Sequence, residues 1–383
     1  MGGLPRRFLN LIVGNENKGI RSLRCVDLTR HQLFHPDTSP PGSLAMETIR
    51  LPSPTFRFKA WHFSCFPLAD RKVLCKQGNR YENSFLFDAD TRQVVTMPTL
   101  RPFNYGKALS LFVPTAGDDP DPDASLFFLQ RWPEQEPKSR LRPESDQFQA
   151  LVYRRTSKTS PSKSWQHQVL PPPPYLRDPW YWRRCTKIMS YAIVGGGGSH
   201  ICISVDRAGT YCMDTVTNAW SKVGDWTLPF LGKVEYVPEL KLWFGFSDYY
   251  NGKDQRLVAA DLSCLDSGPE LVGTWNWEEE LDDTPTGWRQ QRESQLVYLG
   301  SGKFCIVKFL LDRNTTTWPW FDSREIVLDH SFSVLTGLEV QRVTDGGGCS
   351  GSGGRHGGGK VELRLIKRQS RRTPNGIYIE NAF

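Results

Sequence analysis

The stretch that indicates the fold most clearly reads GTYCMDTVTNAWSKVGDWTLPF and covers residues 209–230. It consists of an apolar run, an Asp-led turn at Asp214, an aromatic run that contains Trp220, and a Leu-Pro end. Short runs rich in aromatic and apolar residues, bounded by Gly, Pro, Asp or Asn, are typical of β-strands. The stretch therefore predicts a strand, a turn and a second strand.

The same layout recurs along the chain. Three further copies cover residues 83–100, 149–173 and 256–277. The last two carry Trp165 and Trp275, and the tryptophans of the three successive Trp-bearing copies lie 55 residues apart. A period of about 40–50 residues with about four strands per repeat is typical of β-propeller blades, and longer loops account for the wider spacing.

These repeats predict an all-β, kelch-like β-propeller of about six blades. One four-stranded blade leaves its apolar faces uncovered, so blades must stack around a ring. We expect the ring to close by pairing of the N- and C-terminal strands, with residues 6–13 meeting either 361–367 or 376–380. We expect residues 1–383 to form a single domain, with the Gly-rich segment 345–359 as a flexible loop insertion.

The composition fits many short strands joined by turns. The 383 residues include 13 Trp, 12 Tyr and 21 Phe, together with 33 Gly and 27 Pro. The net charge of +7 is dispersed along the chain, which argues against nucleic acid as a partner. No apolar stretch approaches the roughly 20 residues that span a bilayer. We therefore expect no membrane partner. We also expect the protein to be monomeric.

The nine cysteines are widely spaced, and no CxxC pair occurs among them. Most of them, including Cys202 and Cys305, lie inside apolar runs. This pattern predicts buried free thiols in a reducing compartment rather than a disulfide framework or a zinc site. The N-terminal residues also lack a secretory signal pattern. The expected location is the cytoplasm or the nucleus.

Several segments resemble a known plant family. RRFLNLIV at residues 6–13, GIRSLRCVDLTRHQLFHP at 19–36 and FLFDADTRQVVTMPTL at 85–100 are similar to domain of unknown function 1668, a family expanded in grasses, as are KLWFGFS at 241–247 and LVAADL at 257–262. The resemblance covers most of the chain. It implies a kelch-like propeller of the F-box-associated type, with no assigned activity.

The resemblance does not extend to an F-box. F-box adaptors of similar repeat type carry a helical segment of about 40–50 residues before the propeller. Here a strand is expected to begin near Arg6. We therefore expect no F-box.

Acidic residues recur where short apolar runs end. They are Asp27, Asp88, Asp206, Asp214 and Asp261. Carboxylates arrayed around a ring could serve a sugar-hydrolysing propeller. Asp at a strand end also accepts hydrogen bonds from the following turn, and this is the interpretation that we favour.

No other motif indicates catalysis or metal binding. His200 and Cys202 would share one face of a strand and could hold a metal with a third ligand, but the sequence offers no evident third ligand, which favours burial. The four glycines at 195–198 lack the Lys and Ser or Thr of a P-loop and predict a hairpin loop. We therefore predict no catalytic residue, no metal and no cofactor.

One segment stands out as a candidate surface for a partner. Residues 171–185 read PPPPYLRDPWYWRRC. Aromatic residues beside Arg are typical of binding hot spots and of stacking platforms for single-stranded nucleic acid. The alternative is that these aromatic side chains pack between blades. The candidate partner-binding residues are Trp180, Tyr181, Trp182, Arg183 and Arg184.

The leading functional hypothesis is a non-catalytic scaffold that binds a protein partner through blade-connecting loops. The alternative is a propeller enzyme that acts on a sugar or a small metabolite; a central pocket with converging carboxylates and His would favour it, and an apolar plug would favour the scaffold. A third hypothesis is RNA binding through residues 180–184 and a basic C-terminal strand that contains Arg364, Lys367, Arg368, Arg371 and Arg372.

Overall fold

The computed structural model describes most of the chain. The described residues are 6–30, 32–34, 46–59, 63–68, 71–77, 83–101, 108–115, 119, 121–134, 145–157, 162–181, 187–195, 198–247, 255–277, 288–317, 325–343 and 362–383. The Gly-rich segment 345–359 lies outside them, and its predicted flexibility stays a prediction.

The described part of the chain is built from β-strands and short 3-10 turns. Sixteen strands form four sheets of four. The first sheet has the order β24 (Ile377–Ala382), β1 (Phe8–Asn15), β2 (Ile20–Asp27), β3 (Phe56–Lys59), and the second has the order β4 (Phe63–Pro67), β5 (Lys72–Gln77), β6 (Ser84–Asp88), β7 (Gln93–Thr96). The third has the order β8 (Ala108–Pro114), β9 (Ala124–Gln130), β10 (Ser145–Arg155), β11 (Lys163–Leu170), and the fourth has the order β20 (Trp288–Gly300), β21 (Lys303–Thr317), β22 (Glu325–Arg342), β23 (Leu363–Arg372). The 3-10 turns are η1 (Gln32–Phe34), η3 (Pro174–Arg177), η4 (Pro179–Tyr181) and η6 (Leu265–Ser267).

A fifth sheet has eight strands. Their order is β15 (Trp220–Gly224), β14 (Gly209–Asp214), β13 (His200–Val205), β12 (Ile188–Val194), β16 (Leu231–Val237), β17 (Leu242–Phe246), β18 (Arg256–Asp261) and β19 (Glu270–Asn276). Its two four-stranded halves are antiparallel. They meet through a short parallel pairing of β12 with β16, in which Ser190 lies opposite Gly232 and Tyr191 opposite Lys233.

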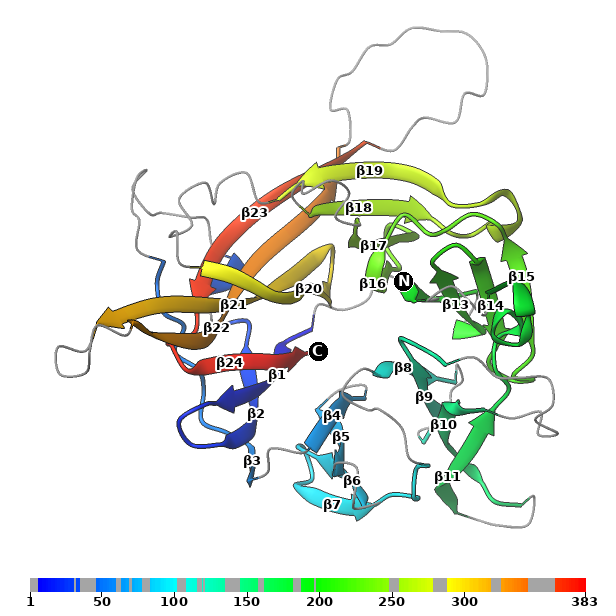
Figure 1. Cartoon of the computed structure of the whole chain (residues 1–383), viewed down its shortest axis with the longest axis horizontal. Helices are drawn as coiled ribbons and strands as arrows, with labels where there is room; N and C mark the ends of the chain where they lie inside the picture. The colour runs from blue at the N-terminus through cyan, green and yellow to red at the C-terminus, as the bar shows by residue number, and fades with distance from the viewer. Residues whose placement is uncertain are drawn as a thin grey trace, which may run out of the picture.

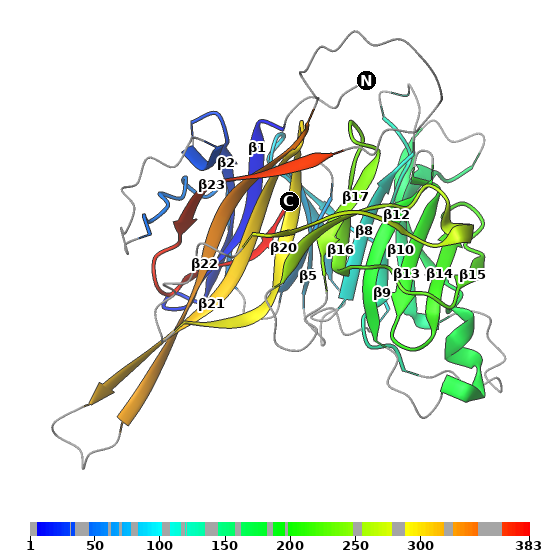
Figure 2. The ribbon, with the colours of Figure 1, turned by 90° about the horizontal axis from the view of Figure 1, so that it is seen from above.

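The sheets stand around a common centre, with one edge strand of each four-stranded run facing inward (Figure 1). In the side view the strands run roughly along one direction, and the hairpin of β21 and β22 extends beyond the rest (Figure 2). This all-β, propeller-like arrangement agrees with the predicted fold class.

The repeated tryptophans occupy equivalent positions. Trp165 lies on β11, Trp220 on β15 and Trp275 on β19, and each of these strands is the last of its four-stranded run. The strand β7, which carries Val94 and Val95, has the same position in its sheet. The indole nitrogen of Trp220 donates a hydrogen bond to the carbonyl oxygen of Pro171 at 2.9 Å. The sequence repeat thus corresponds to one strand position repeated in successive sheets.

The two ends of the chain meet in one sheet. Strand β1 pairs with β24, so the predicted partner of residues 6–13 is 376–380, whereas β23 pairs with β22. Asn10 and Phe383 exchange backbone hydrogen bonds of 2.9 and 3.0 Å. The innermost strand of this sheet therefore comes from the C-terminus, and its neighbour comes from the N-terminus.

Hydrophobic clusters fill the spaces between neighbouring sheets. Six of them each combine residues of two adjacent four-stranded runs. One of the six lies between β20–β23 and the sheet of β24 and β1–β3. Burial of such apolar surface is the main driving force for stacking the sheets. Each cluster contains one of the following buried residues: Phe128, Phe148, Trp243, Phe304, Leu335 and Val73.

The interpretation of the strand-end aspartates as turn residues is confirmed for four of five. Asp27, Asp88, Asp214 and Asp261 each accept a hydrogen bond from a backbone N–H two residues ahead, at 2.8 to 3.0 Å. Asp206 differs, because the contact of its carboxylate is with Arg207 at 3.9 Å. The four carboxylates that accept these bonds stabilise the turns that follow their strands.

This arrangement predicts a pH dependence of stability. Hydrogen bonds from the backbone N–H groups of Thr217 and Val216 lower the pKa of Asp214. A carboxylate with a lowered folded-state pKa stabilises the fold above its unfolded pKa of about 4 and loses this effect as the pH falls through the folded value. In D214A we expect a melting temperature a few degrees below that of the parent at pH 7, and a gap that closes towards pH 2.

Asp206 supplies the matched control for this measurement. Thermal melts of D206A should track the parent protein at every pH between 7 and 2, because its carboxylate holds no turn N–H. Equal pH profiles for D206A and D214A would contradict the turn role of Asp214.

The cysteine prediction is wrong in one respect. Cys202 and Cys212 form a disulfide between β13 and β14, with their Cα atoms 4.2 Å apart. Cys65, Cys75 and Cys305 are buried free thiols as expected, but Cys264 is exposed. The error has a physical origin: spacing along the chain does not reveal which residues a hairpin register places opposite one another.

Candidate functional site

A cavity of about 1130 Å³ lies where the inner strands meet. The inner strand of every four-stranded run contributes to its lining, with one residue each from β4, β8, β12, β16, β20 and β24: Pro67, Phe112, Ile193, Tyr236, Tyr298 and Ala382. Further lining residues come from β13, β14, β15, β17 and η6. Side chains alternate between the two faces of a strand, so only part of each inner strand can reach the cavity. The cavity is thus a property of the whole sheet arrangement.

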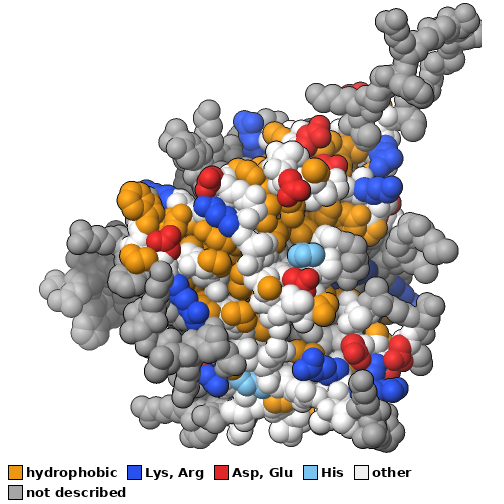
Figure 3. Space-filling model, turned by 90° about the vertical axis from the view of Figure 1, so that its right-hand side faces the viewer, with side chains coloured by type: hydrophobic (Ala, Val, Ile, Leu, Met, Phe, Trp, Pro, Cys, Tyr) orange, Lys and Arg blue, Asp and Glu red, His pale blue; other side chains and the backbone are white. Residues whose placement is uncertain are grey.

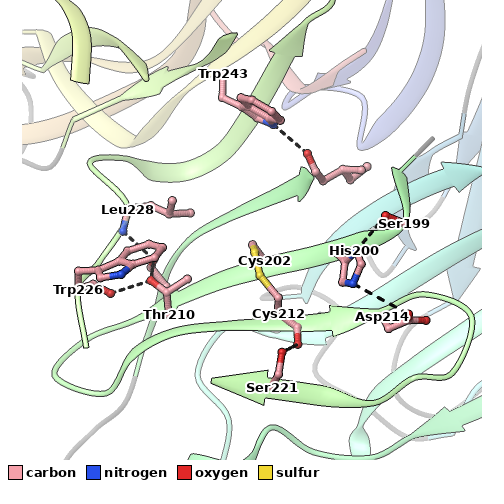
Figure 4. The surroundings of a disulfide bond; sticks show 12 residues. Ser199, His200, Cys202, Thr210, Cys212, Asp214, Ser221, Trp226, Leu228 and Trp243 are labelled. Carbon is pink, nitrogen blue, oxygen red and sulfur yellow. Dashed lines mark hydrogen bonds and ion pairs between the residues drawn. A yellow bond between two sulfur atoms is a disulfide. The ribbon is translucent and has the colours of Figure 1, made fainter. Parts of the chain in front are cut away.

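Much of the lining is apolar or aromatic. The rings of Tyr236 and Trp243 lie 4.5 Å apart, and both side chains line the cavity. The indole nitrogen of Trp243 donates to the carbonyl oxygen of Ile193 at 2.9 Å, which fixes the ring against the other four-stranded half of the eight-stranded sheet (Figure 4). Tyr236 is 40% exposed. A cavity that combines apolar and polar lining with an accessible aromatic side chain is typical of a binding site.

The polar groups of the cavity are engaged by the protein itself. Lys233 donates to Glu235 at 2.8 Å. Tyr298 donates to Glu239 at 2.5 Å, and burial together with this carboxylate raises the pKa of the tyrosine. Glu235 is thus paired with a lysine, and Asp266 on η6 is another acidic residue of the lining.

His200 does not form the metal site that the sequence allowed. Its ring lies 2.8 Å from the hydroxyl of Ser199 and 4.0 Å from the carboxylate of Asp214, while Cys202 is bonded to Cys212 (Figure 4). Within the described ranges, no group of three or more His, Cys, Asp or Glu side chains could hold a metal ion. The disulfide also lies at the cavity, because Cys212 contributes to its lining.

A smaller cavity of about 420 Å³ adjoins the first and is strongly charged. Both carboxylate oxygens of Glu293 lie 2.6 Å from the guanidinium of Arg131, and Lys187 lies 3.6 Å from one of them. Arg292 donates to the backbone carbonyls of Ile379 and Glu380, and its guanidinium lies 3.6 Å from the ring centre of Phe309. Arg292 thus ties β20 to the terminal strand β24, while Glu293 ties β20 to Arg131 after β9 and to Lys187 before β12.

A wall of polar side chains separates the two cavities. Tyr191, Lys233, Gln295 and Asn381 line both. The amide of Gln295 donates to the side chain of Asn381 at 2.9 Å and to the carbonyl oxygen of Ala382 at 2.6 Å. The larger cavity is therefore bounded on one side by groups that hydrogen-bond to one another.

The predicted partner-binding segment is partly buried. Tyr175 on η3 is fully buried between two sheets, and Tyr181 on η4 packs against the same cluster. Trp180 is 69% exposed, and its backbone N–H donates to Asp178 at 3.0 Å. Trp182, Arg183 and Arg184 lie outside the described residues. Of the candidate residues in the described part, the structure therefore gives only Trp180 a largely exposed side chain.

The basic C-terminal strand engages its own sheet. Arg368 forms an ion pair with Glu339 at 2.7 Å, and Arg371 pairs with Glu47. The guanidinium of Arg372 lies over the rings of Trp288 and Phe332, at 5.2 and 4.6 Å. Figure 3 shows a different face, the right-hand side of Figure 1, and there Lys and Arg side chains are scattered among Asp, Glu and apolar side chains. These contacts give the strand a role in packing.

Sequence patterns singled out few of the cavity residues, among them His200 and the loop glycines Gly195 and Gly198. Most of the others come from strands and loops that are far apart along the chain. Their shared feature, a place on or near the inner strand of a run, is a property of the fold and has no local signal in the sequence.

The fold and its central cavity define the class of protein: an all-β, propeller-like protein with a hollow where the inner strands meet. The chain belongs to the family described as "Protein of unknown function (DUF1668)", which matches residues 6–373. The comparison with curated proteins finds no match. Within the described ranges, no helix is long and apolar enough to cross a membrane.

Solved structures that are similar to the chain include the following two. The β-propeller domain of Cps50 (Swd1) from Myceliophteria thermophila has 9% sequence identity and a TM-score of 0.34, with 86% of this chain and 93% of that chain covered. The WD40 domain of SCAP from fission yeast has 9% identity and a TM-score of 0.29, with 95% and 88% covered.

Proposed function

We propose that this protein is a non-catalytic interaction scaffold, and that a segment of a protein partner binds at the larger central cavity and the blade-connecting loops around it. The observation that carries the proposal is the cavity of about 1130 Å³ with its accessible aromatic side chain. Protein interfaces are rich in Tyr and Trp at their centre and are depleted of charge there. The pair formed by Tyr236 and Trp243 fits this description.

The proposal includes a ring of six blades, closed by pairing of β1 with β24. Its support is the series of six hydrophobic clusters, one between each pair of neighbouring four-stranded runs. A closed ring protects the apolar faces of every blade and gives the cavity a rigid wall. The kelch-like classification, the monomeric state, and the cytoplasmic or nuclear location stay predictions.

The ion pairs of two cavity carboxylates favour a scaffold over a sugar-processing enzyme. Glycoside hydrolysis uses two carboxyl groups on either side of the scissile bond, roughly 5 to 9.5 Å apart. In the described cavity walls, Glu235 is paired with Lys233, and Glu293 is paired with Arg131. The contacts within β23 likewise favour packing over RNA binding.

Replacing Tyr236 by Arg tests the proposed site. Tyr236 is partly exposed, so Y236R should melt within a few degrees of the parent protein. It replaces the aromatic ring that we propose to contact the partner by a charge, and we expect at least about 30-fold weaker binding of the partner, since central interface residues contribute about 2 kcal/mol or more. The measurement is affinity capture with quantitative mass spectrometry, followed by binding of the recombinant partner.

The control is V216R, because Val216 is 83% exposed and lies outside the cavity lining. V216R should capture the same proteins as the parent. Equal partner affinity for Y236R and the parent, with both folded, would overturn the proposed binding site.

A further inference from the structure

Two pairs of cysteines lie directly opposite each other on neighbouring strands. Cys202 on β13 is opposite Cys212 on β14, and Cys65 on β4 is opposite Cys75 on β5. The first pair is a disulfide, whereas the sulfur atoms of the second pair lie 3.9 Å apart as free thiols. Both pairs belong to antiparallel hairpins, and in each the two cysteines are ten residues apart along the chain.

The hydrogen-bond pattern places both pairs at the same kind of position. In the first hairpin the N–H of Thr215 donates to the carbonyl of Ser199, and in the second the N–H of Leu68 donates to the carbonyl of Lys72. Hydrogen-bonded and non-hydrogen-bonded pairs alternate along an antiparallel ladder. Each cysteine pair is three steps from these bonds, so each is non-hydrogen-bonded.

This position brings side chains close enough for a disulfide. Opposite residues in a non-hydrogen-bonded pair have Cα atoms about 4.5 Å apart, near the lower end of the range seen in disulfides. The disulfide between Cys202 and Cys212 demonstrates that a hairpin of this chain accommodates the bond. Cys65 and Cys75 have the same register, and their sulfur atoms are already in contact.

The environment determines when such a bond can form. Cys65 and Cys75 are 7% and 1% exposed, in the cluster between the sheet of β1 and the sheet of β4. The hydrogen bond with Cys75 and burial raise the pKa of the Cys65 thiol, with Glu380 and Arg21 as further charges nearby. Because the thiolate is the reactive form, the folded pair is protected from oxidants. The bond must therefore form before the two sheets pack together.

We propose that Cys65 and Cys75 are a second disulfide site, oxidised during folding by a low-molecular-weight disulfide such as oxidised glutathione. One cysteine thiolate attacks oxidised glutathione, which forms a mixed disulfide and releases one glutathione thiolate. The second cysteine thiolate then attacks the protein sulfur of that mixed disulfide and displaces the other glutathione. Two cysteine thiols are oxidised to one protein disulfide, and one oxidised glutathione is reduced to two glutathione molecules.

The bond would lie beside the central cavity. Strand β4 also contributes Pro67 to the cavity lining, and Phe383, another lining residue, packs on the cluster that holds the two thiols. A covalent link between β4 and β5 therefore holds one part of the cavity wall to the strand behind it. The inference is independent of what the cavity binds.

Cys305 provides a control within the same chain. It is fully buried, and the residues opposite it are Val297 on β20 and Gly337 on β22. It has burial comparable to that of Cys75 but no thiol across the ladder. Under the same conditions it should remain a free thiol.

Oxidative refolding of the full chain tests the proposal. The reduced, denatured protein is refolded in mixtures of reduced and oxidised glutathione, quenched by acid, alkylated and digested. We expect the linked Cys65–Cys75 and Cys202–Cys212 peptides to appear over a similar range of mixtures, with Cys305 alkylated. The oxidised protein should melt a few degrees above the same protein with Cys65 and Cys75 reduced, because a short loop is closed in the unfolded state.

The double variant C65A/C75A keeps the experiment decisive. It should fold and form the Cys202–Cys212 bond. Oxidation should raise its melting temperature less than it raises that of the parent, because the second bond cannot form. Alkylated Cys65 and Cys75 in mixtures that bridge Cys202 and Cys212 would overturn the proposal. Linkage of Cys65 to any cysteine other than Cys75, or the absence of both bonds in the most oxidising mixture, would also overturn it.

Discussion

A chain that ends at residue 375 is expected to lose its cooperative unfolding transition. The deletion removes β24, whose Ile379 and Ala382 are buried between two sheets, and it leaves the edge of β1 unpaired. Loss of one large buried aliphatic side chain alone costs about 2–5 kcal/mol. Because natural proteins unfold at a cost of only about 5–15 kcal/mol, removal of the whole strand should leave little or no stability.

The measurement is thermal and urea unfolding of the truncated chain, with and without a synthetic peptide of residues 374–383. The peptide should restore a sharp transition, because it supplies the missing strand to β1. Shortening the Gly-rich segment 345–359 is the comparison, and it should change the melting temperature little, since closure entropy depends weakly on loop length. A truncated chain that melts like the parent would contradict the role of β24 in holding the ring.

The class of fold could be predicted from the sequence because its signal is local and repeated. Each copy around Trp165, Trp220 and Trp275 is a strand, a turn and a strand, and the structure places these tryptophans at one position in successive sheets. The pairing of the two termini was also predictable, because a ring leaves each terminal strand only a few possible neighbours. The choice of 376–380 over 361–367 was not, since both segments have strand character.

The candidate site depends on contacts that the sequence does not encode locally. Tyr236 and Trp243 approach each other through the register of β16 with β17, and Trp243 reaches Ile193 in another four-stranded run. The disulfide was missed for the same reason. Cys202 and Cys212 look like ordinary residues of two apolar strands until the hairpin register places them opposite each other.

The segment 171–181 shows how a correct composition signal can lead to an incomplete assignment. Its aromatic residues suggested a surface, yet Tyr175 and Tyr181 pack against the cluster between β8–β11 and β12–β15. The packing of Tyr175 and Tyr181 agrees with the interpretation as a buried connection, whereas partner binding by residues 180–184 stays a prediction. Tyr175 anchors it, and the exposed Trp180 five residues later is available for contact.

Replacing Tyr175 by Ala should therefore cost about 3–5 kcal/mol of unfolding free energy, as for other large buried aromatic side chains. Its ring is 1% exposed and lies 5.2 Å from the ring of Tyr211. Y175F provides the matched comparison. The Tyr175 hydroxyl is buried and hydrogen-bonds to no other residue in the described part of the chain, so its removal should leave stability unchanged or slightly raised.

Trp180 completes this series, because replacing it should leave the unfolding free energy nearly unchanged, whereas replacing Tyr175 in the same segment should lower it. W180A should change the unfolding free energy by less than about 0.5 kcal/mol, as expected for an exposed site. If residues 180–184 also bind the partner, W180A should weaken capture while its urea midpoint stays that of the parent. A marked loss of stability in W180A, or none in Y175A, would contradict the division of this segment into a buried anchor at Tyr175 and an accessible aromatic residue at Trp180.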